Sequence, residues 1–102
     1  MNAFAGEERR RSSRVQSQRP VLVTTTGSQP QAVTAFTFSI SQFGCAVRCS
    51  TSFLPGTRVT LACEDKRISG KVSFVLSSSA QAGFELGIAF EEDGSEFWGE
   101  KF

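Results

Sequence analysis

Hydrophobic and polar residues alternate along much of the chain, which is the pattern of β-strands with one face buried. In the clearest run, Ile68, Val72 and Phe74 share one face, while polar side chains of the intervening residues occupy the other. Turn-forming residues such as Gly27 and Pro55 separate the runs. The pattern predicts six strands, over residues 21–26, 32–38, 43–49, 58–63, 68–74 and 84–90.

A short helix is predicted after the last strand. Asp93 is a candidate N-cap, and Glu96 follows three residues later to complete a capping box. Trp98 and Phe102 have the spacing of one helical face, so we expect about two turns. Six short strands and one helix in 102 residues predict a single all-β domain, a six-stranded antiparallel β-barrel with a short C-terminal helix.

Composition narrows the chemistry. The chain has no His, so imidazole-based triads and Cys2His2 zinc sites are excluded, and no base and nucleophile pair can be proposed. Cys45, Cys49 and Cys63 lack the CxxC spacing of a metal site and have the sequence parity of buried strand residues, so we expect reduced core thiols and no metal. Most of the ten Phe also have the inward parity of their strands and are expected to pack in the core.

Charge is sorted along the chain although the net charge is only +1. Residues 7–19 are rich in arginine, whereas residues 91–102 are mostly acidic. We therefore expect a flexible basic arm over residues 1–18 and the barrel over residues 19–102. A local cluster of arginines favours a small anionic ligand over a nucleic-acid backbone, which needs a broad basic face. The apolar runs are too short to insert into a membrane, and a cytoplasmic protein is expected.

Two segments have compositions unlike a barrel core. The first is the arginine cluster before the first strand, with Arg10, Arg11 and Arg14. The second is a Ser-x-Ser-x-x-Gly segment, with Ser39, Ser41 and Gly44, which is predicted to form a turn between the second and third strands. In this order, the two segments resemble the RRxxR and D/N-x-S-x-x-G motifs of the PilZ domain family. Later features of that family also match, over residues 9 to about 98: Pro55 with Gly56, Gly70 with Val72, and Gly87 with Phe90.

The resemblance implies a PilZ-like split barrel that acts as a bacterial receptor for the second messenger cyclic di-GMP. It implies no enzyme activity and no cofactor, and it assigns the ligand to the residues of the two motifs: Arg10, Arg11, Arg14, Ser39, Ser41 and Gly44. Arginine suits this ligand because its planar guanidinium can clamp a phosphate or stack on a purine. We expect the arm to fold across the barrel when the ligand bridges it to residues 39–44, and to signal to an unidentified downstream protein.

One position departs from the family pattern. Ser39 occupies the place of an Asp or Asn that helps to hold the guanine edge, and a hydroxyl cannot accept two donors as a carboxylate does. Two other functions therefore stay open. The first alternative to the receptor is a degenerate PilZ-like adapter that works through protein contacts without nucleotide. The second, less favoured, is a small nucleic-acid-binding barrel that uses the arginine arm.

Overall fold

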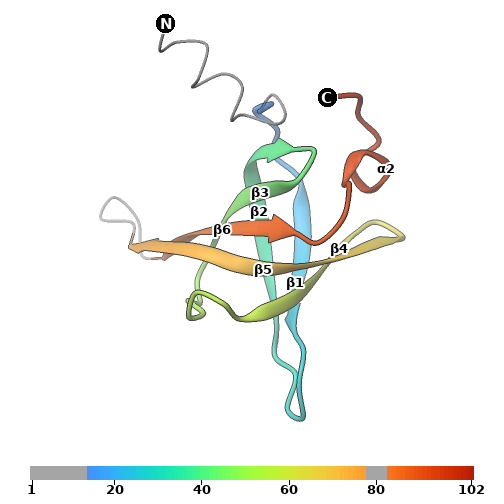
Figure 1. Ribbon diagram of the computed structural model, residues 1–102. Coiled ribbons are helices and arrows are strands. Elements are labelled where there is room, and N and C mark those ends of the chain that lie inside the picture. The colour runs from blue at the N-terminus through green and yellow to red at the C-terminus, as the bar shows by residue number, and fades with distance from the viewer. Residues whose placement is uncertain (1–13, 78–82) are drawn as a thin grey trace, which may run out of the picture.

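The alternating segments form the six strands of a closed antiparallel barrel. In the computed structural model, which describes residues 14–77 and 83–102, the strands pair in the order β1-β2-β3-β6-β5-β4, and β1 pairs with β4 to close the sheet (Figure 1). The strands are β1 (Pro20–Thr25), β2 (Ala32–Ser41), β3 (Gly44–Cys49), β4 (Arg58–Cys63), β5 (Lys66–Ser77) and β6 (Phe84–Phe90). The predicted fold class is thus confirmed.

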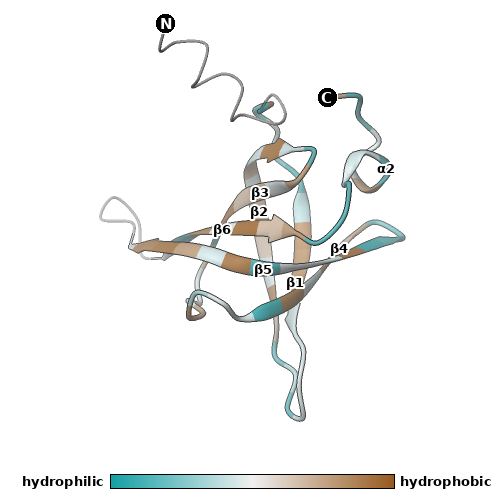
Figure 2. Cartoon of the chain, in the orientation of Figure 1, coloured by the Kyte–Doolittle hydropathy of each residue, from teal (hydrophilic) through white to brown (hydrophobic). Residues whose placement is uncertain are grey.

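The inside of the barrel is filled mainly by aliphatic side chains. Val23, Val47, Leu61 and Leu86 are fully buried, and burial of each such side chain contributes roughly 1.5–3 kcal/mol. Figure 2 shows hydrophobic residues concentrated on the strands, whereas the chain that leaves β6 is hydrophilic. Cys49 and Cys63 are buried and Cys45 is partly buried, all three as free thiols, in agreement with the expected reduced core cysteines.

Two β-bulges change which residues of their strands face the core. In β2 the register shifts between Thr37 and Ser39, so the buried positions are Ala35, Thr37 and then Ile40. In β5 a shift between Val72 and Phe74 turns Phe74 outward, where it is 41% exposed. The expected inward face of β5 is therefore correct up to Val72 and wrong at Phe74.

The phenylalanines contribute less to the core than their parity predicted. Phe53, Phe90 and Phe97 are buried, but Phe36 is 54% exposed. Its neighbour Ala35 pairs with the buried Val21 of β1 and faces the core, so Phe36 faces the outside. Instead, the aromatic residues form a cluster at one end of the barrel, where the Phe97 and Trp98 rings meet edge to face with centroids 4.7 Å apart.

The C-terminal helix α2 (Ser95–Trp98) is one turn long, shorter than predicted. Gly94, not Asp93, occupies the N-cap position, although the Asp93 carboxylate still accepts a hydrogen bond of 2.8 Å from the Ser95 N–H. Gly99 adopts the left-handed conformation with φ 70° and ends the helix, so Phe102 lies beyond it. In Figure 1, α2 (red) and the segment before β1 (blue) lie at the same end of the barrel.

A substitution at Gly44 tests how closely β3 packs against β6. A Cβ at this position would collide with the backbone carbonyl oxygen of Ile88, which cannot move without breaking the β3–β6 pairing. We expect Gly44→Ala to lower the free energy of unfolding by about 1–3 kcal/mol, as overpacked sites do, measured by urea denaturation. Gly87→Ala is the matched control: the nearest atoms to its Cβ belong to the ring of the half-exposed Phe74, which can rotate away, so the loss should be smaller. Equal losses would contradict this account.

Candidate functional site

The segment before β1 is paired with the edge of β2. We call residues 14–19 the strap. The Val15 N–H donates to the Ile40 carbonyl and the Ile40 N–H donates to the Val15 carbonyl, both at 2.9 Å. Because this bridge is antiparallel, the strap residues that flank Val15 lie beside the β2 residues that flank Ile40. Arg14 is thereby placed next to Ser41, and Gln16 next to Ser39.

The serines of β2 face the outside of the barrel. Ile40 is fully buried, and neighbouring residues of a strand point to opposite faces, so Ser39 and Ser41 point outward and are partly buried. The Ser39–Gly44 segment was predicted as a turn between strands. That expectation is wrong for its first half, because Ser39 to Ser41 extend β2, and only Gln42 and Phe43 form the turn.

Ser41 and Gly44 pair with each other at the two ends of the turn. The Ser41 hydroxyl lies 3.3 Å from the Gly44 carbonyl oxygen, a long hydrogen bond that a stronger acceptor could replace. Gly44 is buried against β6. Ser41 therefore has a hydroxyl available for a ligand at the surface, whereas Gly44 contributes by allowing the close approach of the two strands.

An open depression of about 470 Å³ lies further along the strap, and none of Arg14, Ser39, Ser41 and Gly44 lines it. It is lined by Gln16, Ser17 and Gln18 of the strap, by Phe38 of β2 and by Arg48 of β3. The Arg48 guanidinium lies 4.6 Å from the centre of the Phe38 ring, in cation–π geometry, and its Nη2 is 3.3 Å from a carboxylate oxygen of Glu85. Its side chain remains 52% exposed, so this cation can still meet an anion or stack on an aromatic ring.

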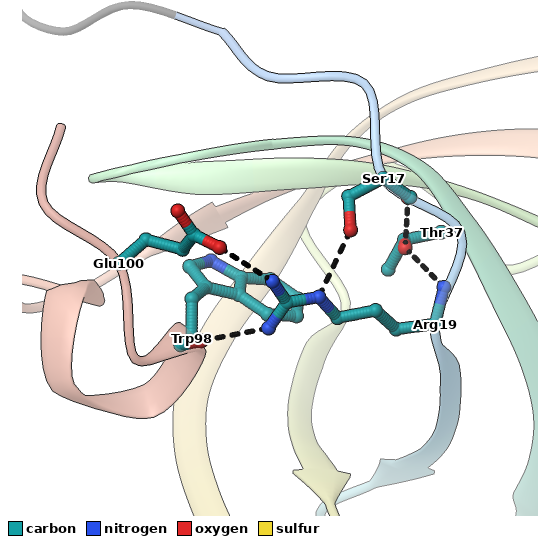
Figure 3. A network of polar contacts seen from close by, with 5 residues as sticks. All are labelled: Ser17, Arg19, Thr37, Trp98 and Glu100. Carbon is teal, nitrogen blue, oxygen red and sulfur yellow. Dashed lines mark hydrogen bonds and ion pairs between the residues drawn. The ribbon is translucent and has the colours of Figure 1, made fainter.

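The base of the strap is fixed by Arg19 (Figure 3). Its Nε donates to the Ser17 hydroxyl at 2.9 Å, its Nη1 to the Trp98 carbonyl at 2.7 Å and its Nη2 to the Glu100 carboxylate at 2.9 Å. Its backbone N–H donates to the hydroxyl of Thr37 at 2.9 Å, and that hydroxyl donates to the Ser17 carbonyl at 2.6 Å. The strap is thus bound to β2 at both of its ends.

The predicted site residues divide into two groups. Arg14, Ser39, Ser41 and Gly44 lie near one another at the strap and the β2–β3 turn, whereas Arg10 and Arg11 lie outside the described residues. Sequence reasoning did not single out Arg48 or the role of Arg19. Arg48 had a visible signal, since it is the one charged residue in the sequence of β3, GCAVRC.

Two residues next to the β2–β3 turn have shifted pKa values. Burial raises the pKa of the Cys45 thiol and keeps it protonated, so it is a poor nucleophile. Hydrogen bonds from the side chain of Gln42 and from Ser95 lower the pKa of Asp93, which sits at the surface beside the turn.

In residues 14–77 and 83–102, no cluster of side chains suited to a metal ion occurs. Within the same residues, no helix has the length and apolar character needed to cross a membrane.

Comparison with known proteins gives a family and a fold. Solved structures that match include the inhibitor of motility from Bacillus subtilis (MotI/DgrA), with a TM-score of 0.69 and 14% sequence identity over 85% of this chain. This chain spans 44% of that protein, and at such identity the likeness concerns the fold alone. No curated protein matches. The family model of the PilZ domain matches residues 8–96, which include the arginine motif, the whole barrel and the start of α2; the chain belongs to the PilZ domain family.

Proposed function

We propose that this domain is a receptor for cyclic di-GMP that binds the dinucleotide between the strap and the β2–β3 turn. PilZ domains are receptor and adapter modules for this messenger, not enzymes. The observation that carries the proposal is the backbone pairing of Val15 with Ile40, which sets Arg14 of the first motif beside Ser41 of the second. Two motifs separated by more than twenty residues in sequence thereby share one surface.

The chemistry of this surface suits a doubly phosphorylated purine ligand. Arg14 is exposed and can offer two parallel N–H donors to a phosphate or to the O6 and N7 of guanine. Arg10 and Arg11 complete the same motif. The hydroxyl of Ser41 can donate to a phosphate oxygen, and Arg48 supplies a second exposed cation in the depression further along the strap.

A change of conformation on binding follows from how the strap is held. Among the described residues, the Val15 bridge is the backbone contact that holds the half of the strap next to Arg14, so a ligand that pulls on the guanidinium can reposition this half without opening the barrel. A downstream protein in the cytoplasm would then read the new position of the strap. This readout is a proposal that follows from the receptor function.

A second function is favoured by one residue. Ser39 stands where the family motif has Asp or Asn, and it offers a single short hydroxyl to the guanine edge. Loss of a charge-assisted hydrogen bond costs about 1.5–3 kcal/mol, or about tenfold or more in the dissociation constant. A domain that has lost nucleotide affinity would act as an adapter through protein contacts alone.

Removal of the Arg14 guanidinium tests the receptor function. We expect wild-type protein to bind cyclic di-GMP in a calorimetric titration, and Arg14→Ala to weaken binding by at least about tenfold because a charge-assisted contact is lost. Arg67→Ala is the matched control: Arg67 is equally an exposed arginine but lies on the β4–β5 hairpin, and its loss should leave affinity within about twofold. The same loss in both variants would point to general electrostatic attraction.

Tighter, strongly salt-dependent binding of single-stranded DNA than of cyclic di-GMP would instead favour the nucleic-acid function.

Restoring the family carboxylate separates receptor from adapter. We expect Ser39→Asp to tighten cyclic di-GMP binding by about tenfold, since the carboxylate accepts both N–H donors of the guanine edge. Ser39→Ala serves as the control and should not tighten binding. Binding by Ser39→Asp together with no heat from wild type would support the adapter. If neither protein binds, the cyclic di-GMP site proposed here is wrong.

A further inference from the structure

The C-terminal segment, residues 91–102, contacts both halves of the candidate site. On the strap side, Arg19 donates hydrogen bonds to the Trp98 carbonyl and the Glu100 carboxylate. On the turn side, the Gln42 side chain donates to Asp93 at 2.6 Å, and the Gln42 carbonyl accepts from the Gly94 N–H, also at 2.6 Å. The segment therefore bridges the two elements that the proposed ligand would also bridge.

Arg19 is the main polar link between the strap and this segment. Its side chain is only 26% exposed and lies with its Cζ 5.5 Å from the centre of the Trp98 ring, so cation–π attraction adds to its hydrogen bonds. Trp98 contacts Arg19 through its ring face and its backbone carbonyl (Figure 3). The indole N–H of Trp98 is buried and has no hydrogen-bond partner among the described residues.

Neither segment is held by a continuous backbone ladder, although Phe97 and Trp98 of α2 are buried in the core. The helix α2 is a single turn, and isolated helices of that length do not persist in water. The strap forms one isolated bridge and no continuous strand ladder. Since Nε of Arg19 binds Ser17 while its two terminal nitrogens bind Trp98 and Glu100, one planar group orders both segments at once.

We propose that Arg19 is a positioning residue that couples the strap to the C-terminal segment, so that residues 14–18 and 95–100 are ordered and released together. Release of the C-terminal segment removes two of the three hydrogen-bond partners of the Arg19 guanidinium, and release of the strap removes the third. The other segment is then held less firmly, and by linkage the effect is the same in both directions. For its ligand-dependent part this inference rests on the proposed function, whereas the coupling itself does not.

Amide hydrogen exchange in the ligand-free chain, measured residue by residue by NMR, tests the coupling. Glu100→Ala removes a contact of Arg19 and lies outside the strap. We expect it to speed exchange at Val15 and Ile40, whose N–H groups form the strap bridge, by about threefold to tenfold. Arg19→Gln should speed exchange at both segments by about tenfold or more, and adding Glu100→Ala to it should change nothing further.

Two controls make the result specific. Glu92→Ala removes another exposed acid from the same segment and should leave the strap amides unchanged. The amides of Leu61 and Leu86, in the barrel core, should remain slow in every variant. Faster exchange near Glu100 with no change at Val15 would overturn the proposal. So would an equal rise at Leu61 and Leu86, because the whole barrel would then be opening.

Trp98 fluorescence gives the ligand-dependent part its own readout. If cyclic di-GMP repositions the strap, its addition should change the Trp98 emission in wild type and in Glu92→Ala. In Arg19→Lys, which keeps the charge but not the planar group of donors, the change should be lost. Binding by wild type without any change at Trp98 would overturn this part. Absence of binding would refute the proposed function, while the exchange experiment would still decide the coupling.

Discussion

One buried hydroxyl determines where the strap lies. Thr37 is 1% exposed, and it is the one buried polar side chain in the described part of the chain. A hydroxyl placed there destabilises the fold unless it is hydrogen-bonded, and both of its bonds go to the strap, from the Arg19 N–H and to the Ser17 carbonyl. The strap must therefore cross the end of the barrel at Thr37. The position of Arg14 beside Ser41 follows from that constraint a few residues further along.

Local patterns were sufficient to predict the barrel, but not the details of two strands. The period of two identified all six strands, and β4 was predicted at its observed bounds. The errors at Phe36 and Phe74 have a physical cause: burial depends on the register against the neighbouring strand and on the bulges, and both arise from tertiary pairing. The helix was overestimated because the left-handed conformation of Gly99 ends it after one turn.

The candidate site was predictable to the extent that it follows short motifs. Ser39, Ser41 and Gly44 could be selected from sequence, yet their description as a turn was wrong, since the burial of Ile40 makes this stretch part of β2. The spatial pairing of the two motifs depends on the Val15–Ile40 bridge, which joins residues distant in sequence. Arg48 was missed because its place beside Phe38 and the strap is set by the β2–β3 register, which no motif encodes.

The fold also changes the meaning of the charge distribution. In sequence, the basic residues near the N-terminus and the acidic residues near the C-terminus suggested an arm that seeks an external anion. In the structure, the strap meets the C-terminal segment, and the pair of Arg19 and Glu100 neutralises one charge of each group. Arg14 and Arg48 remain exposed, and among the described residues the long contact to Glu85 opposes the charge of Arg48. Arg14 and Arg48 therefore stay available to an anion, while Arg19 supplies the fixed point from which the strap is positioned.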